Sequence, residues 1–233
     1  MRRLNDLEVF YSLLDELARR ARGPRRLAEC NGRLGWPKRG VYFFFEPGEP
    51  RSHSGDGLRV VRVGTHALTA GSGSSLWGRL SQHRGQAKGG GNHRGSIFRL
   101  LVGKSLMRRD GYLQYSTWGQ GSSAPAAIRH GEVGLEVEVS RVIGCMPFLW
   151  LTIEDAPGPE SERGLVERNA IALLSNYGKE ALDPPSAGWL GHSCDRERVR
   201  GSGLWNSNHV EESYDPAFLD VMARLVAAEG GQS

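Results

Sequence analysis

Arg79 and His83 are the first residues whose types and spacing could support chemistry. They stand four positions apart in the segment SSLWGRLSQHRG, so a helix would place them on one face, with Arg84 directly after them. An arginine fork and an imidazole on one face can bind the same phosphate group. Leu76 and Leu80 lie beside them and would dock this helix on a neighbouring element. The alternative is a solvated helix surface, and the spacing leaves both interpretations open.

Tyr42 is the second candidate, and it lies in the segment GVYFFFE. In a strand, Val41 and Phe43 would occupy one face and the Tyr42 ring the opposite face. A tyrosine in such a place is most often a packing residue. Its position therefore indicates which face of the sheet to examine, without assigning a role.

Glu167 is the third candidate, because Ile171 and Leu174 follow it at helical spacing and bring it to the inward stripe of a helix. A buried carboxylate without a partner is costly. Glu167 must therefore be exposed at the edge of the stripe, paired with an arginine, or bound to a metal ion, and spacing alone favours the ion pair. A single carboxylate, with waters and substrate phosphates, is also a common way of holding Mg²⁺.

The elements that must position these residues follow from periodicity and from turn residues. Residues 132–146 fit a helix or a strand, and we favour the helix. The order of elements indicates an α+β fold with a small antiparallel sheet flanked by helices. The sequence predicts strands at 40–46, 58–64 and 147–155. It predicts helices at 4–22, 76–84 (capped by Ser74 or Ser75), 96–109, 132–146, 159–176 (capped by Ser161) and 215–228. It predicts loops at 23–39, 85–95, 110–129 and 183–213.

The composition is that of a globular protein with one main core, since 39% of the 233 residues are hydrophobic. The net charge is +4, and arginines cluster at 19–26, 79–99 and 196–200, which suits either a solvated surface or a nucleic-acid footprint. The cysteines, Cys30, Cys145 and Cys194, are too far apart to suggest a disulfide framework or a zinc site. Without an apolar run long enough to span a membrane, we expect a cytoplasmic protein that has no membrane partner.

Three segments taken together resemble the signature of the GIY-YIG nuclease family. They are Gly40-Val41-Tyr42, then Arg62-Val63-Gly64, and then the run from Leu76 to His83. The match covers about residues 40–84 and resumes at Glu167. The resemblance implies a three-stranded antiparallel sheet flanked by helices, with the two tripeptides on adjacent strands.

The resemblance also implies a role for each candidate. Tyr42 would deprotonate or orient the attacking water, and His83 would assist proton transfer or hold the phosphate. Arg79 would neutralise charge on the phosphate, and Mg²⁺ or Mn²⁺ on Glu167 would stabilise the leaving oxygen. The substrate implied is DNA.

One position departs from the family pattern, because Arg62 stands where the second tyrosine is usual. This arginine could bind phosphate, indicate weakened catalysis, or be an ordinary strand residue. The family often has an asparagine beyond the glutamate helix, for which Asn206 is the first candidate and Asn176 the second.

Further nucleic-acid contacts are predicted at Arg84 and at His93 and Arg94, which lie with Asn92 in a glycine-rich loop. A mobile solvent loop is the alternative there. Asn208 and His209 could suggest HNH-type chemistry, but the rest of that motif is not evident.

These observations predict an N-terminal helix and basic linker at 1–36 and a GIY-YIG-like nuclease domain at 37–228, with an insertion at about 85–146. The insertion and the basic N-terminal helix would contact DNA, and cutting both strands would favour a homodimer. No helicase-binding or helix-hairpin-helix segment is visible, so we expect a restriction or defence endonuclease, an inference by analogy. The main rival is an inactive nucleic-acid-binding protein of the same fold. A protein-interaction module is the third alternative, and it predicts no salt-dependent affinity for DNA.

Overall fold

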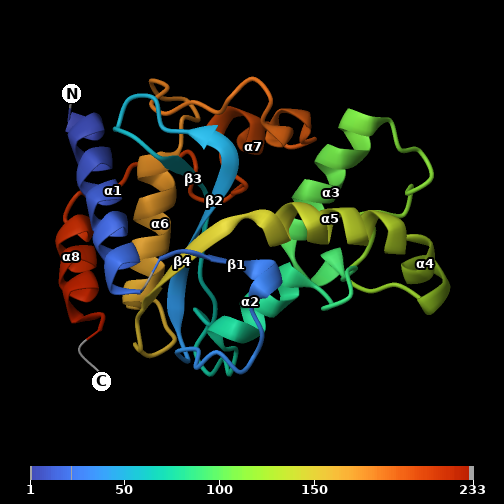
Figure 1. The fold of residues 1–233 in the computed structure, drawn as a ribbon, viewed down its shortest axis with the longest axis horizontal. Helices are drawn as coiled ribbons and strands as arrows, with labels where there is room; N and C mark the ends of the chain where they lie inside the picture. Colours follow the sequence, from blue (N-terminus) through green and yellow to red (C-terminus); the bar gives the residue numbers. More distant parts are fainter. Residues whose placement is uncertain (1, 22, 231–233) are drawn as a thin grey trace.

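The computed structural model describes residues 2–21 and 23–230. A central antiparallel sheet separates two layers of helices, which lie on the left and the right of the view in Figure 1. The predicted α+β class is confirmed. No helix within the described residues is sufficiently long and apolar to cross a lipid bilayer.

The sheet has four strands in the order β1-β4-β2-β3. They are β1 (Arg25–Arg26), β2 (Gly40–Pro50), β3 (Leu58–Gly64) and β4 (Pro147–Thr152). The three longer strands are those predicted, although β4 ends before residue 155. The fourth strand was not predicted, because its two residues are exposed arginines without any alternation of polarity.

The alternation of side chains along β2 assigns one core to each face of the sheet. Val41 and Phe43 pack with α1 (Arg2–Arg20), α6 (Glu162–Leu174) and α8 (Phe218–Ala228). Tyr42 and Phe44 pack on the other face with α2 (Leu76–Arg84), α3 (Ile97–Asp110) and α5 (Val133–Cys145). The prediction that Tyr42 points away from Val41 and Phe43 is therefore confirmed.

Helix α1 belongs to the same core as the sheet, because Leu7, Phe10 and Leu14 are buried against it. Figure 1 shows α1 beside α6 and α8, on the side of the sheet away from α3 and α5. The predicted N-terminal helix is thus a layer of the main fold. It lies on the opposite face from Tyr42.

Several predicted loops contain short helices. Residues 110–129 end in α4 (Ala126–Gly131), and the tail contains a 3-10 helix (Leu190–Ser193) and α7 (Glu197–Ser202). Two more 3-10 turns occur at Leu27–Glu29 and His93–Gly95, and α8 begins at Phe218 instead of residue 215. Helix α4 buries no residue, so it has no apolar stripe to reveal it in the sequence. Helix α7 and the 3-10 turns are too short to show a helical period.

Candidate active site

A cleft of about 470 Å³ lies where β2, β3, α2, α6 and the segment after α7 meet. It brings together three of the four main candidates and Arg62. The residues that carry the argument below are Tyr42, Arg62, Thr65, Arg79, Glu167 and Asn206, all in the cleft wall. His83 stands behind Tyr42 and reaches the cleft through it.

Tyr42 begins a chain of buried hydrogen bonds. Its hydroxyl lies 2.8 Å from His83 Nε2, and His83 Nδ1 lies 2.7 Å from the Ser96 hydroxyl. Ser96 is also the N-cap of α3, where its Oγ accepts the Arg99 N–H. The guanidinium of Arg99 donates to the His83 carbonyl over 2.9 Å. The start of α3 and the end of α2 therefore fix the imidazole against the tyrosine.

Gly64 makes room for the Tyr42 ring. The two residues are paired between β2 and β3, and a Cβ atom on Gly64 would lie 2.5 Å from Tyr42 Cζ. This is far closer than two carbon atoms can approach. The glycine that ends the second tripeptide therefore has a physical purpose at this position.

We expect Gly64→Ala to lower the free energy of unfolding by about 1–3 kcal/mol, because the new methyl group must displace the Tyr42 ring. Gly73→Ala is the control, since a Cβ there meets nothing within 4 Å and the backbone is not left-handed. Denaturant unfolding measures both. Equal stability of the two variants would contradict the packing described here.

Arg79 is half-buried in α2 and borders the cleft. Its Nη1 donates to Gln82 Oε1 over 2.9 Å and to the Gly95 carbonyl over 3.1 Å. Within the described residues no carboxylate forms an ion pair with it. The guanidinium is thus held in place by neutral acceptors, and its charge remains available to an anion in the cleft.

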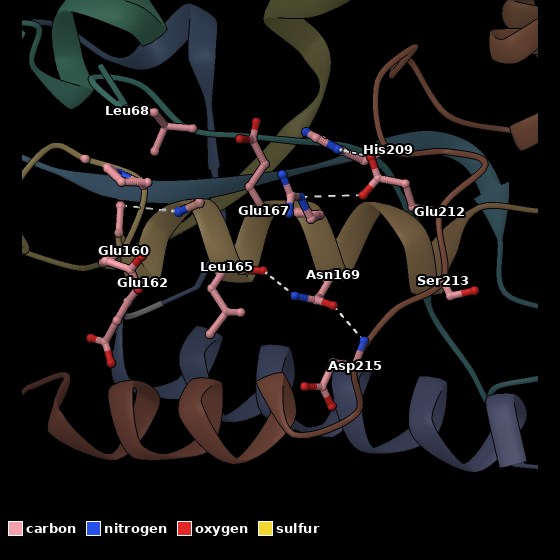
Figure 2. Close-up of a pocket in the computed structure, with 15 residues that line it drawn as sticks. Leu68, Glu160, Glu162, Leu165, Glu167, Asn169, His209, Glu212, Ser213 and Asp215 are labelled. Atoms are coloured by element: carbon pink, nitrogen blue, oxygen red, sulfur yellow. Dashed lines mark hydrogen bonds and ion pairs between the residues drawn. The ribbon is translucent and has the colours of Figure 1, made fainter. Parts of the chain in front are cut away.

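Glu167 lies on α6, whose N-cap is Ser161 as predicted. Its Oε1 accepts the Thr65 N–H over 3.1 Å. Burial raises the pKa of the Glu167 carboxyl above its usual range, and the nearby Arg62 guanidinium and the Thr65 N–H oppose that change. Figure 2 shows Glu167 between Leu68 and His209, at the wall shared with a second hollow.

The second hollow has a volume of about 600 Å³ and an acidic lining. Glu160, Glu162, Glu212 and Asp215 are among its residues, and the His209 imidazole is bonded to Glu212 over 2.7 Å. The cleft is therefore cationic on the side of Arg62 and Arg79 and acidic beyond Glu167. A polyanion would be attracted to the first side and repelled from the second.

The chemistry of Glu167 suits a divalent metal that is completed by its substrate. One carboxylate oxygen is oriented by the Thr65 N–H, and the group borders an open polar cleft. No three His, Cys, Asp or Glu side chains gather into a metal-binding group in the part of the chain that the structure describes. Glu167 therefore fits a Mg²⁺ or Mn²⁺ ion held by one carboxylate, waters and phosphate oxygens, and does not fit a closed structural site.

His83 is neutral at physiological pH. Burial lowers its pKa well below the ordinary value, and the charges of Arg62, Arg79 and Arg99 act in the same direction. A neutral imidazole has one N–H and one lone pair. It can therefore either donate a hydrogen bond to the Tyr42 oxygen or accept the Tyr42 proton.

We expect the melting temperature to fall as the pH is lowered from about 7 to about 5. The pKa of His83 in the folded state lies below the ordinary value of 6.5, so acidification protonates the unfolded chain first and favours it. His66, whose pKa burial lowers to about 4, acts in the same direction. The raised pKa of Glu167 acts in the opposite direction.

Comparing the wild type with His83→Gln isolates the contribution of this imidazole, because His66 and Glu167 are common to both proteins. The variant should show the shallower fall of melting temperature with pH. Parallel curves for the two proteins would contradict a neutral, buried His83.

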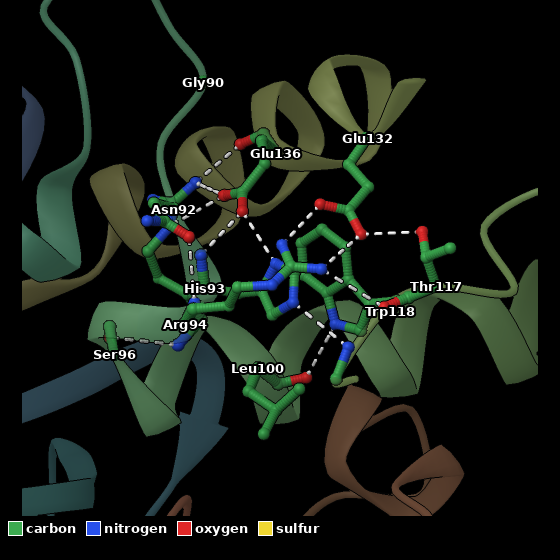
Figure 3. Close-up of polar contacts among 12 residues, drawn as sticks. Gly90, Asn92, His93, Arg94, Ser96, Leu100, Thr117, Trp118, Glu132 and Glu136 are labelled. Carbon is green, nitrogen blue, oxygen red and sulfur yellow. Dashed lines mark hydrogen bonds and ion pairs between the residues drawn. The ribbon is translucent and has the colours of Figure 1, made fainter. Parts of the chain in front are cut away.

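The structure corrects the prediction for His93 and Arg94. Both belong to a buried polar network between α3 and α5, drawn in Figure 3, which fits neither the predicted DNA contact nor the alternative of a mobile solvent loop. His93 is 2% exposed, its Nδ1 lies 3.0 Å from Glu136, and its ring stacks on Trp118. Arg94 pairs with Glu132, with Nη1 2.6 Å from Oε2. The glycines near these residues indicate mobility in the sequence. In the structure, the carboxylates of Glu136 and Glu132, which lie far along the chain, hold both side chains in place.

Of the other predicted nucleic-acid contacts, Arg84 lies away from the cleft, whereas Asn206 lies in its wall. Arg84 is half-buried and borders a separate hollow formed with α5, away from Tyr42. Asn206 borders the cleft, but its amide accepts the Val63 N–H over 3.1 Å and donates to the Val63 carbonyl over 2.9 Å. Its amide therefore pairs with the free edge of β3. Asn176, the second candidate, bonds to Arg3 and Leu182 elsewhere.

Sequence reasoning missed Ser96, which supports His83, and Arg196, which borders the cleft. Ser96 was recognisable as the residue before a helix, but nothing in its spacing indicated that it would meet His83. His209 also borders the cleft, and no second histidine lines the cleft beside it among the described residues.

Comparison with known proteins bears on this site. A protein-family model described as a GIY-YIG domain matches residues 1–231. Among curated proteins and solved structures, none shows significant similarity to the chain. The family match extends over both helical layers and the insertion.

Proposed function

The chain belongs to the GIY-YIG domain family, which is a family of nucleases, and we propose that it is a metal-dependent endonuclease that hydrolyses phosphodiester bonds in DNA. The observation that carries this proposal is the meeting of Tyr42, Arg79 and Glu167 in one cleft, with His83 bonded to Tyr42. Tyr42 and Glu167 are 125 positions apart in the sequence. Packing of α6 and α2 against the same sheet brings them together.

Glu167 would hold the metal ion through its carboxylate, with Thr65 fixing one oxygen. When bound there, Mg²⁺ would supply positive charge that stabilises the leaving 3′ oxygen. The raised pKa of Glu167 implies that acid protonates this ligand more readily than an ordinary glutamate.

Tyr42 and His83 form the proton-handling pair. Tyr42 lines the cleft, where its phenol oxygen would orient a water for attack and accept its proton, while His83 would exchange a proton with the phenol over 2.8 Å. The imidazole is neutral, so it serves this exchange without first losing a proton. Arg79 would bind the phosphate and neutralise the charge that develops in the transition state.

The DNA would approach from the side of α2 and the insertion. The acidic hollow beyond Glu167 disfavours phosphates, whereas the Arg79 side of the cleft carries unpaired positive charge. Helix α1 lies on the far face of the sheet, so we assign the contacts to residues 85–146 and not to α1. A restriction or defence role is proposed by analogy, and cutting both strands with one site per chain would favour a homodimer.

The experiment that tests the substrate class is digestion of labelled duplex DNA, single-stranded DNA and RNA of one sequence by the purified chain with Mg²⁺. We expect duplex DNA to be cut internally, with binding that weakens steeply as salt rises. Cleavage of RNA alone would contradict the DNA assignment. Salt-dependent binding without cleavage of any substrate would favour the rival, an inactive nucleic-acid-binding protein in which Arg62 replaces the usual tyrosine.

A further inference from the structure

Arg62 is a buried cation for which the described residues supply no carboxylate partner. It lies on the edge strand β3 and is 5% exposed. Its Nη1 donates to the Trp205 carbonyl, and its guanidinium carbon lies 4.9 Å from the centre of the Phe98 ring. Its Nε is buried, and no acceptor reaches it within the described residues.

The other deeply buried arginines of the described chain are treated differently. Arg59, Arg99 and Arg163 are each at most 3% exposed, and each is paired with a carboxylate. Their partners are Glu49, Glu136 and Asp155. The fold therefore neutralises each of these three buried guanidinium groups with a carboxylate. Arg62 is the exception, although an unpaired buried charge is costly.

The position of Arg62 indicates where its missing anion comes from. The side chain borders the cleft together with Tyr42, Arg79 and Glu167. Burial lowers the pKa of the Arg62 guanidinium, and the nearby Tyr42 and Glu167 oppose that change, but Glu167 forms no ion pair with it. Among the described residues, three arginines of the cleft lack a carboxylate partner: Arg62 from the strand, Arg79 from the helix, and the exposed Arg196 just before α7.

We propose that Arg62 is a second phosphate-binding arginine, which binds a non-bridging oxygen of the same phosphate group as Arg79. Planar guanidinium groups bind phosphate oxygens through paired N–H donors, and the described residues leave the Nε–H of Arg62 without an acceptor. The assignment of this phosphate to a DNA phosphodiester rests on the proposed function. The inference that the cleft binds a phosphate group is independent of the proposed function.

Inorganic phosphate is the probe that tests this inference, measured by calorimetry on the metal-free full chain at constant ionic strength. Arg62→Met should bind phosphate about tenfold or more weakly than the wild type, the loss expected for a charge-assisted hydrogen bond. Arg79→Met should show a loss of similar size. Arg141→Met, which removes a charge that is 66% exposed on α5, should bind as the wild type does.

Thermal unfolding separates this role from a structural one. Arg62→Met should melt no lower than the wild type, because it removes an uncompensated buried charge while keeping the bulk of the side chain. Arg62→Lys keeps the charge without the fork and should also lose phosphate affinity, which provides a second variant should the first fail to fold.

Wild-type phosphate affinity in Arg62→Met and Arg62→Lys, or no phosphate binding by the wild type, would overturn the inference. A large drop in melting temperature with phosphate affinity retained would show that Arg62 serves the fold instead. Phosphate binding that depends on Arg62 in a protein that cuts no nucleic acid would sustain this inference while contradicting the proposed function.

Discussion

Replacing Glu167 with glutamine should lower metal-dependent DNA cleavage by about a thousandfold or more, the scale expected when a principal electrostatic stabiliser of a transition state is lost. Glutamine has nearly the same shape and can still accept the Thr65 N–H that Oε1 now accepts. It has no negative charge with which to hold Mg²⁺. Because Glu167 is a half-buried acid whose pKa is raised by desolvation, the neutral amide should leave the melting temperature unchanged or higher.

Glu160→Gln is the matched control, since Glu160 is exposed and lines only the neighbouring acidic hollow in Figure 2. It should cleave at the wild-type rate. Cleavage should be followed over a range of Mg²⁺ concentrations, so that weakened metal binding and loss of the chemical step can be separated. Wild-type cleavage by Glu167→Gln would remove this residue from the site.

The second large effect is expected from Tyr42→Phe. The ring would continue to pack against Phe44 and α2, but the hydroxyl that meets His83 at 2.8 Å would be lost. Loss of a positioned proton-transfer group lowers rates by about 10²–10⁴-fold. The variant should also lose about 1–3 kcal/mol of stability, because the buried His83 Nε2 would have no partner.

Tyr11→Phe provides the control for stability alone. Tyr11 is buried on the opposite face of the sheet, where its hydroxyl accepts the Val60 N–H over 3.0 Å. This control should lose comparable stability yet cleave DNA normally. If Tyr42→Phe cleaves as fast as Tyr11→Phe in single-turnover measurements, Tyr42 is a packing residue. The assignment of proton transfer to Tyr42 and His83 would then be wrong.

The sequence predicted the elements whose signals are local. Alternation along residues 40–46 identified the face that carries Tyr42, and Ser75 and Ser161 cap the helices predicted to follow them. The same local signals, together with the resemblance to GIY-YIG nucleases, selected Tyr42, Arg79 and Glu167, which the fold brings to one cleft.

Contacts between distant segments could not be predicted in this way. Nothing near Asn206 indicates that its amide would pair with the backbone of Val63. Likewise, His93 is surrounded by glycines in sequence but by Glu136 and Trp118 in space. A polar residue in a loop reads as a surface group in the sequence when its partners lie far along the chain.

Cleavage of supercoiled plasmid DNA by the purified protein, with Mg²⁺ and with EDTA, is the measurement that tests the central claim most directly. The account predicts nicked and linear products with Mg²⁺, none with EDTA, and none from Glu167→Gln at the same protein concentration. Cleavage that persists in EDTA, or that Glu167→Gln retains, would contradict a metal-dependent nuclease centred on this cleft.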